Sequence, residues 1–456
     1  MFRRDFLNLA AQSCALPVVA ARLEAIEQRN DIAYLHGPYN GAFFHNHNRD
    51  FRMSAGLHFS HGKQHDVLLL NPFSTHEATD ARFEKESLNY TYKPPRTEPT
   101  MEYFGPYTAR AMYSLYRAID WTHMHHEQTY DILSDPKISW AEKKTWTERS
   151  VRYYLTKMDL PRSCAPLDVT MRRAAVMMKP YFTLFRNYYP KSNNFFYGAH
   201  WWHPVAYEAM MIAGNGDHQT PSLEAMEKTY LNDVIKNEPL RMMLSRELMP
   251  RYSRLSPESA NIFDNLHMLH GIAYDVLSYE KWSIDQKRKE IYRVLNAMRY
   301  QPGDDLLARK FRTPHPDMDP RVYSPWMKGP EGEMSRIMME MLEEMMPMMM
   351  PGITPEQKQE VMKQAKVKMT PGLQPEEQPG SLHDALMKVY PAMKMMPGSA
   401  EPGEVASGMV AAMLNGWREK YGMMPDIEPQ PMDREPVFQP PSGGTVTALR
   451  PNGGTV

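Results

Sequence analysis

The stretch His123-Met-His-His126-Glu-Gln-Thr-Tyr130-Asp131 has three gap-free counterparts in the chain. All four copies read His, two residues, His, three residues, a ring-bearing residue and an acid. With 17 His in 456 residues, about 0.6 His-x-x-His pairs are expected by chance. The other three copies are His58-Phe-Ser-His61-Gly-Lys-Gln-His65-Asp66, His200-Trp-Trp-His203-Pro-Val-Ala-Tyr207-Glu208 and His267-Met-Leu-His270-Gly-Ile-Ala-Tyr274-Asp275.

The surrounding residues indicate an internal duplication. Asp120 and Asp264 each precede the first His of their copy by three positions. These two copies, 144 positions apart, also continue alike through Tyr-Asp and Leu-Ser. Such self-similarity at a fixed spacing is typical of a repeated structural unit.

The spacing within the pattern predicts helices. At roughly 100° per residue, the two His and the ring-bearing residue fall within an arc of about 60°, and the acid lies about 80° to one side. Strand signals are nearly absent, so the fold class predicted is all-α: a duplicated helical bundle whose four motif helices line one interior. Successive motifs are separated by more residues than a short-loop bundle needs, which favours a returning element in each unit and roughly parallel motif helices.

Convergent imidazoles point to a metal. A bundle can use one or two polar pairs for register, but a neutral His buried without a partner is costly. Imidazole is the commonest protein ligand for metals, and carboxylates can ligate directly or orient the imidazoles. The predicted metal-binding set is His58, His61, His65, His123, His126, His200, His203, His267, His270, Asp66, Asp131, Glu208, Asp275, Asp120 and Asp264.

Tyrosines and tryptophans complete the predicted site. Tyr130, Tyr207 and Tyr274 are candidate catalytic residues, as ligands, proton donors or radical relays, and Trp201 and Trp202 are expected to pack around the cofactor. The ligand count exceeds the needs of a single zinc ion, which takes three or four. Two metal ions, or a haem with a second ion, fit it better.

Composition excludes several other classes. The formal charge is −1, with 53 basic and 54 acidic residues, so net charge implies neither nucleic acid nor an acidic membrane as partner. No apolar run approaches a membrane span. The two cysteines, Cys14 and Cys164, form no Cys-x-x-Cys pair, which excludes a cysteine zinc finger and a c-type haem attachment site. Phosphate-loop and Gly-x-Ser-x-Gly motifs are absent as well.

The first residues predict export. Phe-Arg-Arg-Asp-Phe-Leu at residues 2–7, a mildly apolar segment and small residues near Ala20 are typical of a twin-arginine signal. An amphipathic first helix with two surface Arg is the alternative. We take residues 1–30 as a twin-arginine leader, which predicts a periplasmic or other extracytoplasmic protein. Twin-arginine export carries folded proteins, often with the cofactor already inserted, which agrees with a metal centre.

The rest of the chain falls into two predicted parts. Residues 31–326 form the His-rich helical domain, in which 71–100 are expected to be a loop or short broken helices, and Ser139 and Ser283 to begin helices with capping boxes. Residues 327–456 hold 21 of the 39 Met and 17 of the 39 Pro. This tail is expected to form short helices with a disordered end that pack on the protein's own body or on a partner.

Three functions remain open from the sequence. The first is an exported metalloprotein with an iron or copper centre, acting in oxidation or electron transfer. The second is a non-catalytic subunit that binds haem or another tetrapyrrole and joins a larger complex through its Met/Pro-rich tail. The third is a zinc-dependent hydrolase.

Overall fold

The computed structural model is helical throughout its described part, with one isolated β-bridge between Arg162 and Arg299. The described residues belong to one compact unit, Gly41–Ser442. They are 41–96, 104–157, 159–214, 218–311, 315–317, 319–323, 332–370, 380–393 and 401–421. The predicted leader, with Cys14, lies outside them.

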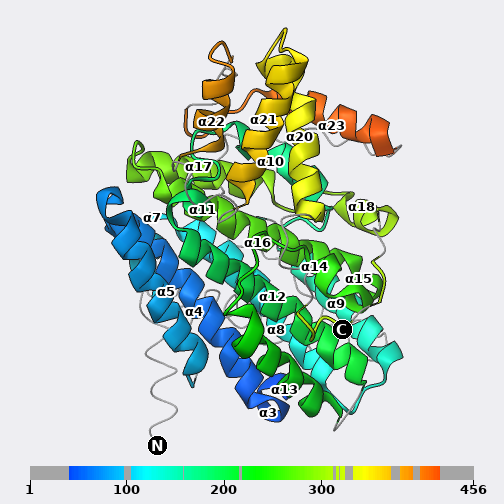
Figure 1. Ribbon diagram of the computed structural model, residues 1–456. Helices are drawn as coiled ribbons and strands as arrows, with labels where there is room; N and C mark the ends of the chain where they lie inside the picture. The colour runs from blue at the N-terminus through cyan, green and yellow to red at the C-terminus, as the bar shows by residue number, and fades with distance from the viewer. Residues whose placement is uncertain are drawn as a thin grey trace, which may run out of the picture. The chain divides into compact units, whose positions relative to one another are not determined.

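Four long helices form the centre of the protein, and each carries one copy of the His motif (Figure 1). The motif begins near the middle of every helix and runs toward its C-terminal end. The four are α4 (Asn48–Leu70), α8 (Tyr113–Ser134), α12 (Pro190–Ala213) and α16 (Pro257–Ser278). The all-α class predicted from the sequence is confirmed.

Each long helix follows a short one through a single bent residue. The short helices are α3 (Ala42–Asn46), α7 (Pro106–Ala111), α11 (Leu184–Tyr188) and α15 (Pro250–Leu255). The bent residues are His47, Met112, Tyr189 and Ser256, with φ from −126° to −144° and ψ from 52° to 85°. Each lies 11 positions before the first His of its motif. The four segments therefore share one backbone path.

The motif acids hold these short helices in place. Asp66 on α4 accepts hydrogen bonds from the Tyr107 and Thr108 backbone N–H groups, at 3.1 and 2.8 Å. Asp131 on α8 accepts from Gly41 and Phe43, both at 3.0 Å. A carboxylate at a helix N-terminus satisfies N–H groups that have no partner within the helix.

The second pair of motif helices repeats this exchange. Asp275 on α16 accepts from the backbone N–H groups of Thr183 and Phe185, at 3.0 and 2.8 Å. Glu208 on α12 accepts from Arg251 and Tyr252, at 3.1 and 3.3 Å.

The capping exchanges set the helix directions. The C-terminal part of α4 lies at the start of the α7–α8 segment, and the C-terminal part of α8 lies at the start of the α3–α4 segment. Helices α4 and α8 therefore run antiparallel. The same exchange makes α12 and α16 antiparallel. The expectation of four roughly parallel motif helices was wrong, because the capping carboxylates place the end of one motif helix beside the start of its partner.

A second helix follows each motif helix. They are α5 (His76–Tyr92), α9 (Trp140–Leu155), α13 (Gln219–Thr229) and α17 (Ile284–Ala297). The capping boxes predicted at Ser139 and Ser283 are present. The loop or broken helices predicted for 71–100 were wrong for α5, because this segment buries one helical face, with Phe83 and Thr79 on it, and Pro72 and Pro94 only delimit the helix.

The remaining elements are shorter or belong to the Met-rich segment. They are η1 (Phe73–Thr75), α10 (Leu167–Ala174), η2 (Val176–Met178), the π-helix η4 (Tyr230–Val234), α14 (Ser245–Leu248), α18 (Asp304–Lys310), α20 (Glu333–Met349), α21 (Pro355–Met369), α22 (Leu382–Val389) and α23 (Ser407–Tyr421).

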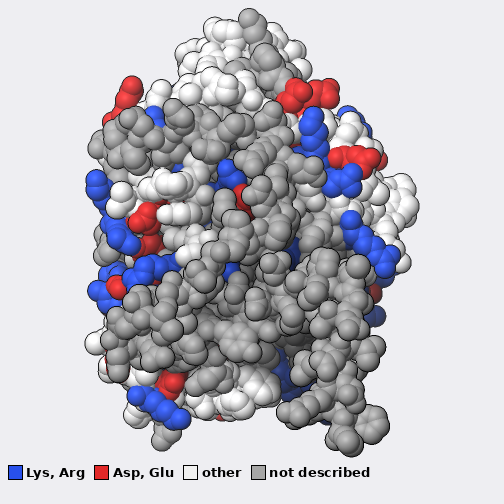
Figure 2. All heavy atoms as spheres, turned by 180° about the vertical axis from the view of Figure 1, so that it is seen from behind, with Lys and Arg blue, Asp and Glu red and all other residues white. Residues whose placement is uncertain are grey.

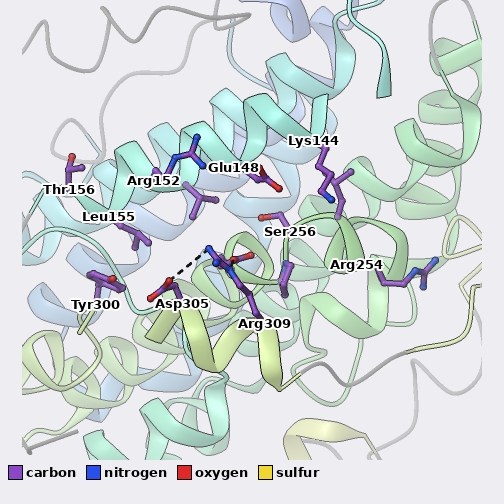
Figure 3. A pocket seen from close by; sticks show the side chains of 14 residues that line it. Lys144, Glu148, Arg152, Leu155, Thr156, Arg254, Ser256, Tyr300, Asp305 and Arg309 are labelled. Carbon is purple, nitrogen blue, oxygen red and sulfur yellow. Dashed lines mark hydrogen bonds and ion pairs between the residues drawn. The ribbon is translucent and has the colours of Figure 1, made fainter. Parts of the chain in front are cut away.

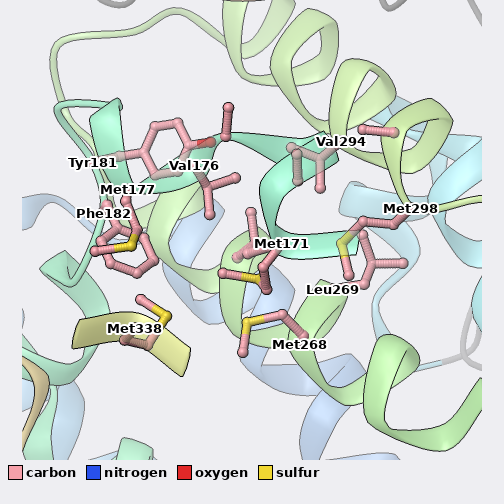
Figure 4. Packing of buried hydrophobic residues seen from close by; sticks show 14 of the residues in the cluster. Met171, Val176, Met177, Tyr181, Phe182, Met268, Leu269, Val294, Met298 and Met338 are labelled. Carbon is pink, nitrogen blue, oxygen red and sulfur yellow. The ribbon is translucent and has the colours of Figure 1, made fainter. Parts of the chain in front are cut away.

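The Met-rich segment packs on the rest of its own chain. Met338 of α20 belongs to the same buried cluster as Met171 and Met268 (Figure 4). Buried ion pairs reinforce this contact: Arg172 of α10 bonds Glu344 of α20 at 2.6 Å, with the Arg172 side chain fully buried. Flexible thioether side chains suit such an irregular apolar contact.

The described surface carries both charge signs. Lys and Arg lie beside Asp and Glu on the face shown in Figure 2, in keeping with the formal charge of −1. Among the described helices, none is both long and apolar enough to cross a membrane.

Candidate metal centre

The nine motif imidazoles are buried and lie close together. Every one is at most 8% exposed. They come from all four long helices, and ring contacts connect the whole set. The ring-centroid distances are His58–His123 3.9 Å, His58–His203 4.8 Å, His58–His126 5.9 Å, His126–His203 5.0 Å, His61–His200 6.5 Å, His61–His270 5.3 Å, His65–His270 5.7 Å, His123–His270 6.1 Å, His200–His267 3.7 Å and His203–His267 6.2 Å.

These separations match the scale of a shared metal ion. Imidazole nitrogens sit about 2.0–2.1 Å from zinc-like ions, so two rings on one ion have centroids roughly 4.5–6.5 Å apart. Most of the pairs fall in that range. The His58–His123 and His200–His267 pairs are closer, at 3.9 and 3.7 Å.

Many of the ring nitrogens have no hydrogen-bond partner. Buried nitrogens without one are both nitrogens of His61, His200, His203 and His270, and Nε2 of His65 and His126. A buried polar atom left unpaired costs roughly 1–3 kcal/mol. So many in one place are unusual in a native protein, and a metal ion bound among the rings would satisfy several of them at once.

Burial keeps the imidazoles neutral. It lowers the pKa of His58 to about 4 and that of His65 and His200 to about 3. For His61 and His203, neighbouring imidazoles add to burial, and the pKa falls well below its usual 6.5. Neutral imidazole is the form that binds metals.

The donor atoms do not surround a common point. Among the described residues, no group of three or more His, Cys, Asp or Glu side chains has the geometry of a metal site. Metal binding therefore requires these rings to turn about their side-chain bonds, which would also separate the two closest pairs.

The three motif tyrosines bind the second His of another motif. The Tyr207 hydroxyl lies 2.6 Å from Nδ1 of His126 and 3.0 Å from its carbonyl oxygen. Tyr130 donates to the His203 carbonyl at 3.3 Å, and Tyr274 to the His61 carbonyl at 3.4 Å. These bonds tie α8 to α12 and α16 to α4. Because the Tyr207 hydroxyl donates to the His126 carbonyl, it can accept from the Nδ1–H of His126, which leaves the lone pair on Nε2 without a partner.

His65 takes the place of tyrosine in the first motif. Its Nδ1 lies 3.0 Å from the hydroxyl of Tyr116, a residue that the sequence did not single out. Its ring stays against His270. The sequence signal for Tyr116 was weak, because it lies about two turns before the motif on α8.

Most of the carboxylates predicted as metal ligands accept hydrogen bonds from backbone N–H groups at the starts of other helices. The four motif acids bind backbone N–H groups of the short helices, as described above. Asp264 likewise accepts from the Ser245 backbone N–H at 2.7 Å, at the start of α14. Asp120 is half-buried on α8. Burial raises the pKa of Asp131 and Asp275 to about 6 and that of Asp264 to about 7.

The two tryptophans face different surroundings. Both are fully buried. Trp202 packs edge-on against His203, at 5.8 Å between centroids, and lies beside Tyr130. Trp201 stacks on Tyr230 of the π-helix, at 6.0 Å and 6°. Of the pair, Trp202 therefore borders the imidazoles.

His125 shows how an ordinary buried histidine is satisfied in this protein. Its two ring nitrogens each lie 2.9 Å from a serine hydroxyl, Ser150 on α9 and Ser259 on α16. Its position in the sequence, between His123 and His126, does not distinguish it from the imidazoles of the cluster. It faces the α9 side of α8 rather than the cluster.

A surface pocket lies between α9, the start of α16 and α18 (Figure 3). Arg309 crosses it and pairs with Asp305 and Glu258. Lys144 and Arg152 line the opposite wall. None of the nine motif imidazoles lines this pocket.

The cluster offers a dense set of neutral nitrogen donors in a dry environment, which suits borderline metal ions. Aromatic side chains such as Phe196 and Phe263 border it and limit the access of water. Comparisons with protein-family models, with curated proteins and with solved structures found no match.

Proposed function

We propose that this chain is an exported metalloprotein whose motif imidazoles hold iron or copper ions in a multinuclear centre that acts in oxidation or electron transfer. The observation that carries the proposal is the set of unpaired, buried ring nitrogens on His61, His65, His126, His200, His203 and His270. A metal ion would satisfy several of these nitrogens at once. In the folded metal-free protein, each nitrogen buried without a partner lowers the free energy of unfolding.

The imidazoles would be the ligands, and the motif acids would act on the scaffold. The bound ions would supply a change of oxidation state. The Tyr207 hydroxyl, 2.6 Å from Nδ1 of His126, would hold that ring in the tautomer that leaves Nε2 available. Tyr130 and Tyr274 would support the centre by fixing adjacent helices.

Burial favours redox chemistry over action on large substrates. All nine rings are at most 8% exposed, so a polymer could not reach an ion held among them without a large rearrangement. Electrons, or a small oxidant or reductant, need no such opening. The imidazoles would hold the ion, and electron transfer to it would not require the protein to open.

The haem alternative is less favoured, because a macrocycle would have to fit among nine rings whose neighbouring centroids lie only 3.7–6.5 Å apart. A zinc-dependent hydrolase is the third candidate, and redox inactivity would distinguish it.

The experiment is metal analysis of the full chain, produced with export to the periplasm. We expect iron or copper to copurify, with an absorption or electron paramagnetic resonance spectrum that changes on reduction. Zinc alone, insensitive to reductant, would replace the redox proposal with the hydrolase. Folded protein that binds neither iron, copper nor zinc on reconstitution would refute a metal centre, and a Soret band would indicate haem.

Export and partner binding remain parts of the proposal. Substitution of Arg3 and Arg4 by Lys should retain the protein in the cytoplasm if residues 1–30 act as a twin-arginine leader. Accumulation in the periplasm despite the substitution would reject that route. A protein partner contacting residues 327–456 would be detected by crosslinking in cells.

A further inference from the structure

We infer that the imidazole cluster comprises two separate metal sites, each built from four imidazoles and related to the other by a pseudo-twofold exchange of the two chain halves. This inference rests on the proposed function, because it concerns how the same imidazoles divide between ions. Site A is His58, His123, His126 and His203, and site B is His61, His200, His267 and His270.

The ring distances group the imidazoles of site A, and the exchange of the chain halves then assigns those of site B. Within site A, His58 lies 3.9, 4.8 and 5.9 Å from His123, His203 and His126. Within site B, the measured neighbours are His200–His267 at 3.7 Å, His61–His270 at 5.3 Å and His61–His200 at 6.5 Å. The contacts between the sites, His123–His270 and His203–His267, are 6.1 and 6.2 Å, which is longer than every contact within site A but shorter than the His61–His200 contact. Four imidazoles fill the coordination sphere of a tetrahedral ion.

Exchanging the chain halves converts one site into the other. A shift of 142 positions takes His58 to His200 and His61 to His203, and a shift of 144 takes His123 to His267 and His126 to His270. The contacts follow this exchange. The pair His58–His123 becomes His200–His267, and His126–His203 becomes His270–His61, at 5.0 and 5.3 Å.

The scaffold obeys the same exchange. Asp66 caps the segment that leads into α8, and its counterpart Glu208 caps the segment that leads into α16. The Lys143 ammonium donates to the Leu133 carbonyl, and Lys287, 144 positions later, donates to the Leu277 carbonyl at 2.6 Å. A symmetry that includes the helix ends as well as the imidazoles is expected from an internal duplication.

One substitution makes the two sites unequal. Tyr207 is the counterpart of His65 under the exchange. At site A, the Tyr207 hydroxyl binds Nδ1 of His126 at 2.6 Å. At site B, His65 lies against His270 with a ring-centroid distance of 5.7 Å, and its buried Nε2 has no partner.

Site B thus has a fifth imidazole where site A has a phenol. Ligand number and hydrogen bonds to the ligands both tune a bound metal. Two ions of the same element would therefore differ in spectrum.

The first test is stoichiometry, with Cu²⁺ as the probe and elemental analysis as the readout. Wild-type protein should bind two equivalents in the cluster. The double variant His58→Asn/His203→Asn and its symmetry counterpart His200→Asn/His61→Asn should each lose one equivalent and keep the other. His125→Asn, which alters a His outside both sites, should keep two.

The outcomes separate this inference from the proposed function. A single equivalent in the wild type, or loss of all copper from either double variant, would mean one shared centre and would overturn the division while the metalloprotein stood. No binding of Cu²⁺, Fe²⁺ or Zn²⁺ by the wild type would reject both.

A second measurement avoids variants that fail to fold. Anomalous scattering from metal-loaded wild-type crystals should give two peaks, one among the rings of each site, and a single peak would refute the division. Electron paramagnetic resonance of the copper form should give two signals. Tyr207→Phe should change only one of them and His65→Phe only the other. Changes in the same signal would refute the inequality of the sites.

Discussion

Burial of neutral imidazoles must make the stability of the metal-free protein depend on pH. The sharpest test compares the wild type with the double variant His65→Leu/His200→Leu. In the folded protein, burial lowers the pKa of both imidazoles to about 3. In the unfolded chain their pKa is about 6.5. A depressed pKa stabilises the folded state above pH 6.5, and this contribution is lost as pH falls toward the folded value.

The magnitude follows from proton binding by the unfolded state. Between pH 7.5 and pH 5.5, each such imidazole lowers the free energy of unfolding by about 1.4 kcal/mol. The wild type should therefore lose about 2.8 kcal/mol more than the double variant over this interval. Buried carboxyls such as Asp131 and Asp264, with pKa values raised to about 6 and 7, act in the opposite direction. Both proteins contain these carboxyls, so their effect cancels in the comparison of the wild type with the double variant.

The assay is urea unfolding of the metal-free proteins at the two pH values, followed by circular dichroism. Replacement of exposed His218 by Leu is the control and should leave the wild-type difference unchanged. A difference between wild type and double variant below about 1 kcal/mol would refute the reasoning, because it would mean that His65 and His200 are protonated in the folded protein.

Three further predictions concern the scaffold and its ion pairs. Asp131→Ala should lower the free energy of unfolding by about 1–2 kcal/mol through loss of the helix cap and leave the metal content unchanged; loss of metal would instead make Asp131 a ligand. Glu290→Ala should cost about 3–5 kcal/mol, measured by urea unfolding, because it leaves the buried charges of Lys179 and Arg293 without their partner. Glu343→Ala, at a side chain 51% exposed, should change stability by less than about 0.5 kcal/mol, and an equal effect of both substitutions would contradict the role of burial.

The sequence predicted the helices well because their signals are local. The offset of seven between His123 and Tyr130 requires a helical face, and the capping box at Ser139 depends only on Glu142 three residues later. Neither needs knowledge of a distant contact. The helix at His76–Tyr92 was missed because its apolar face is sparse and its prolines are conspicuous.

The roles of the acids could not be read from the motif. An acid one residue past the Tyr looks equally suited to a metal and to a helix cap. The deciding fact is that Asp131 meets the N–H groups of Gly41 and Phe43, which lie 90 and 88 positions away. Only the tertiary arrangement brings that helix start within reach of the carboxylate.

His125 and His126 mark the limit of sequence reasoning most clearly. They are adjacent, equally buried and chemically identical, yet His125 has both nitrogens bound by serines, whereas Nε2 of His126 is left without a partner. The 100° between consecutive residues of a helix sends one ring toward α9 and the other toward α12. The same turn that satisfies His125 within the scaffold leaves His126 able to bind something that the chain itself does not supply.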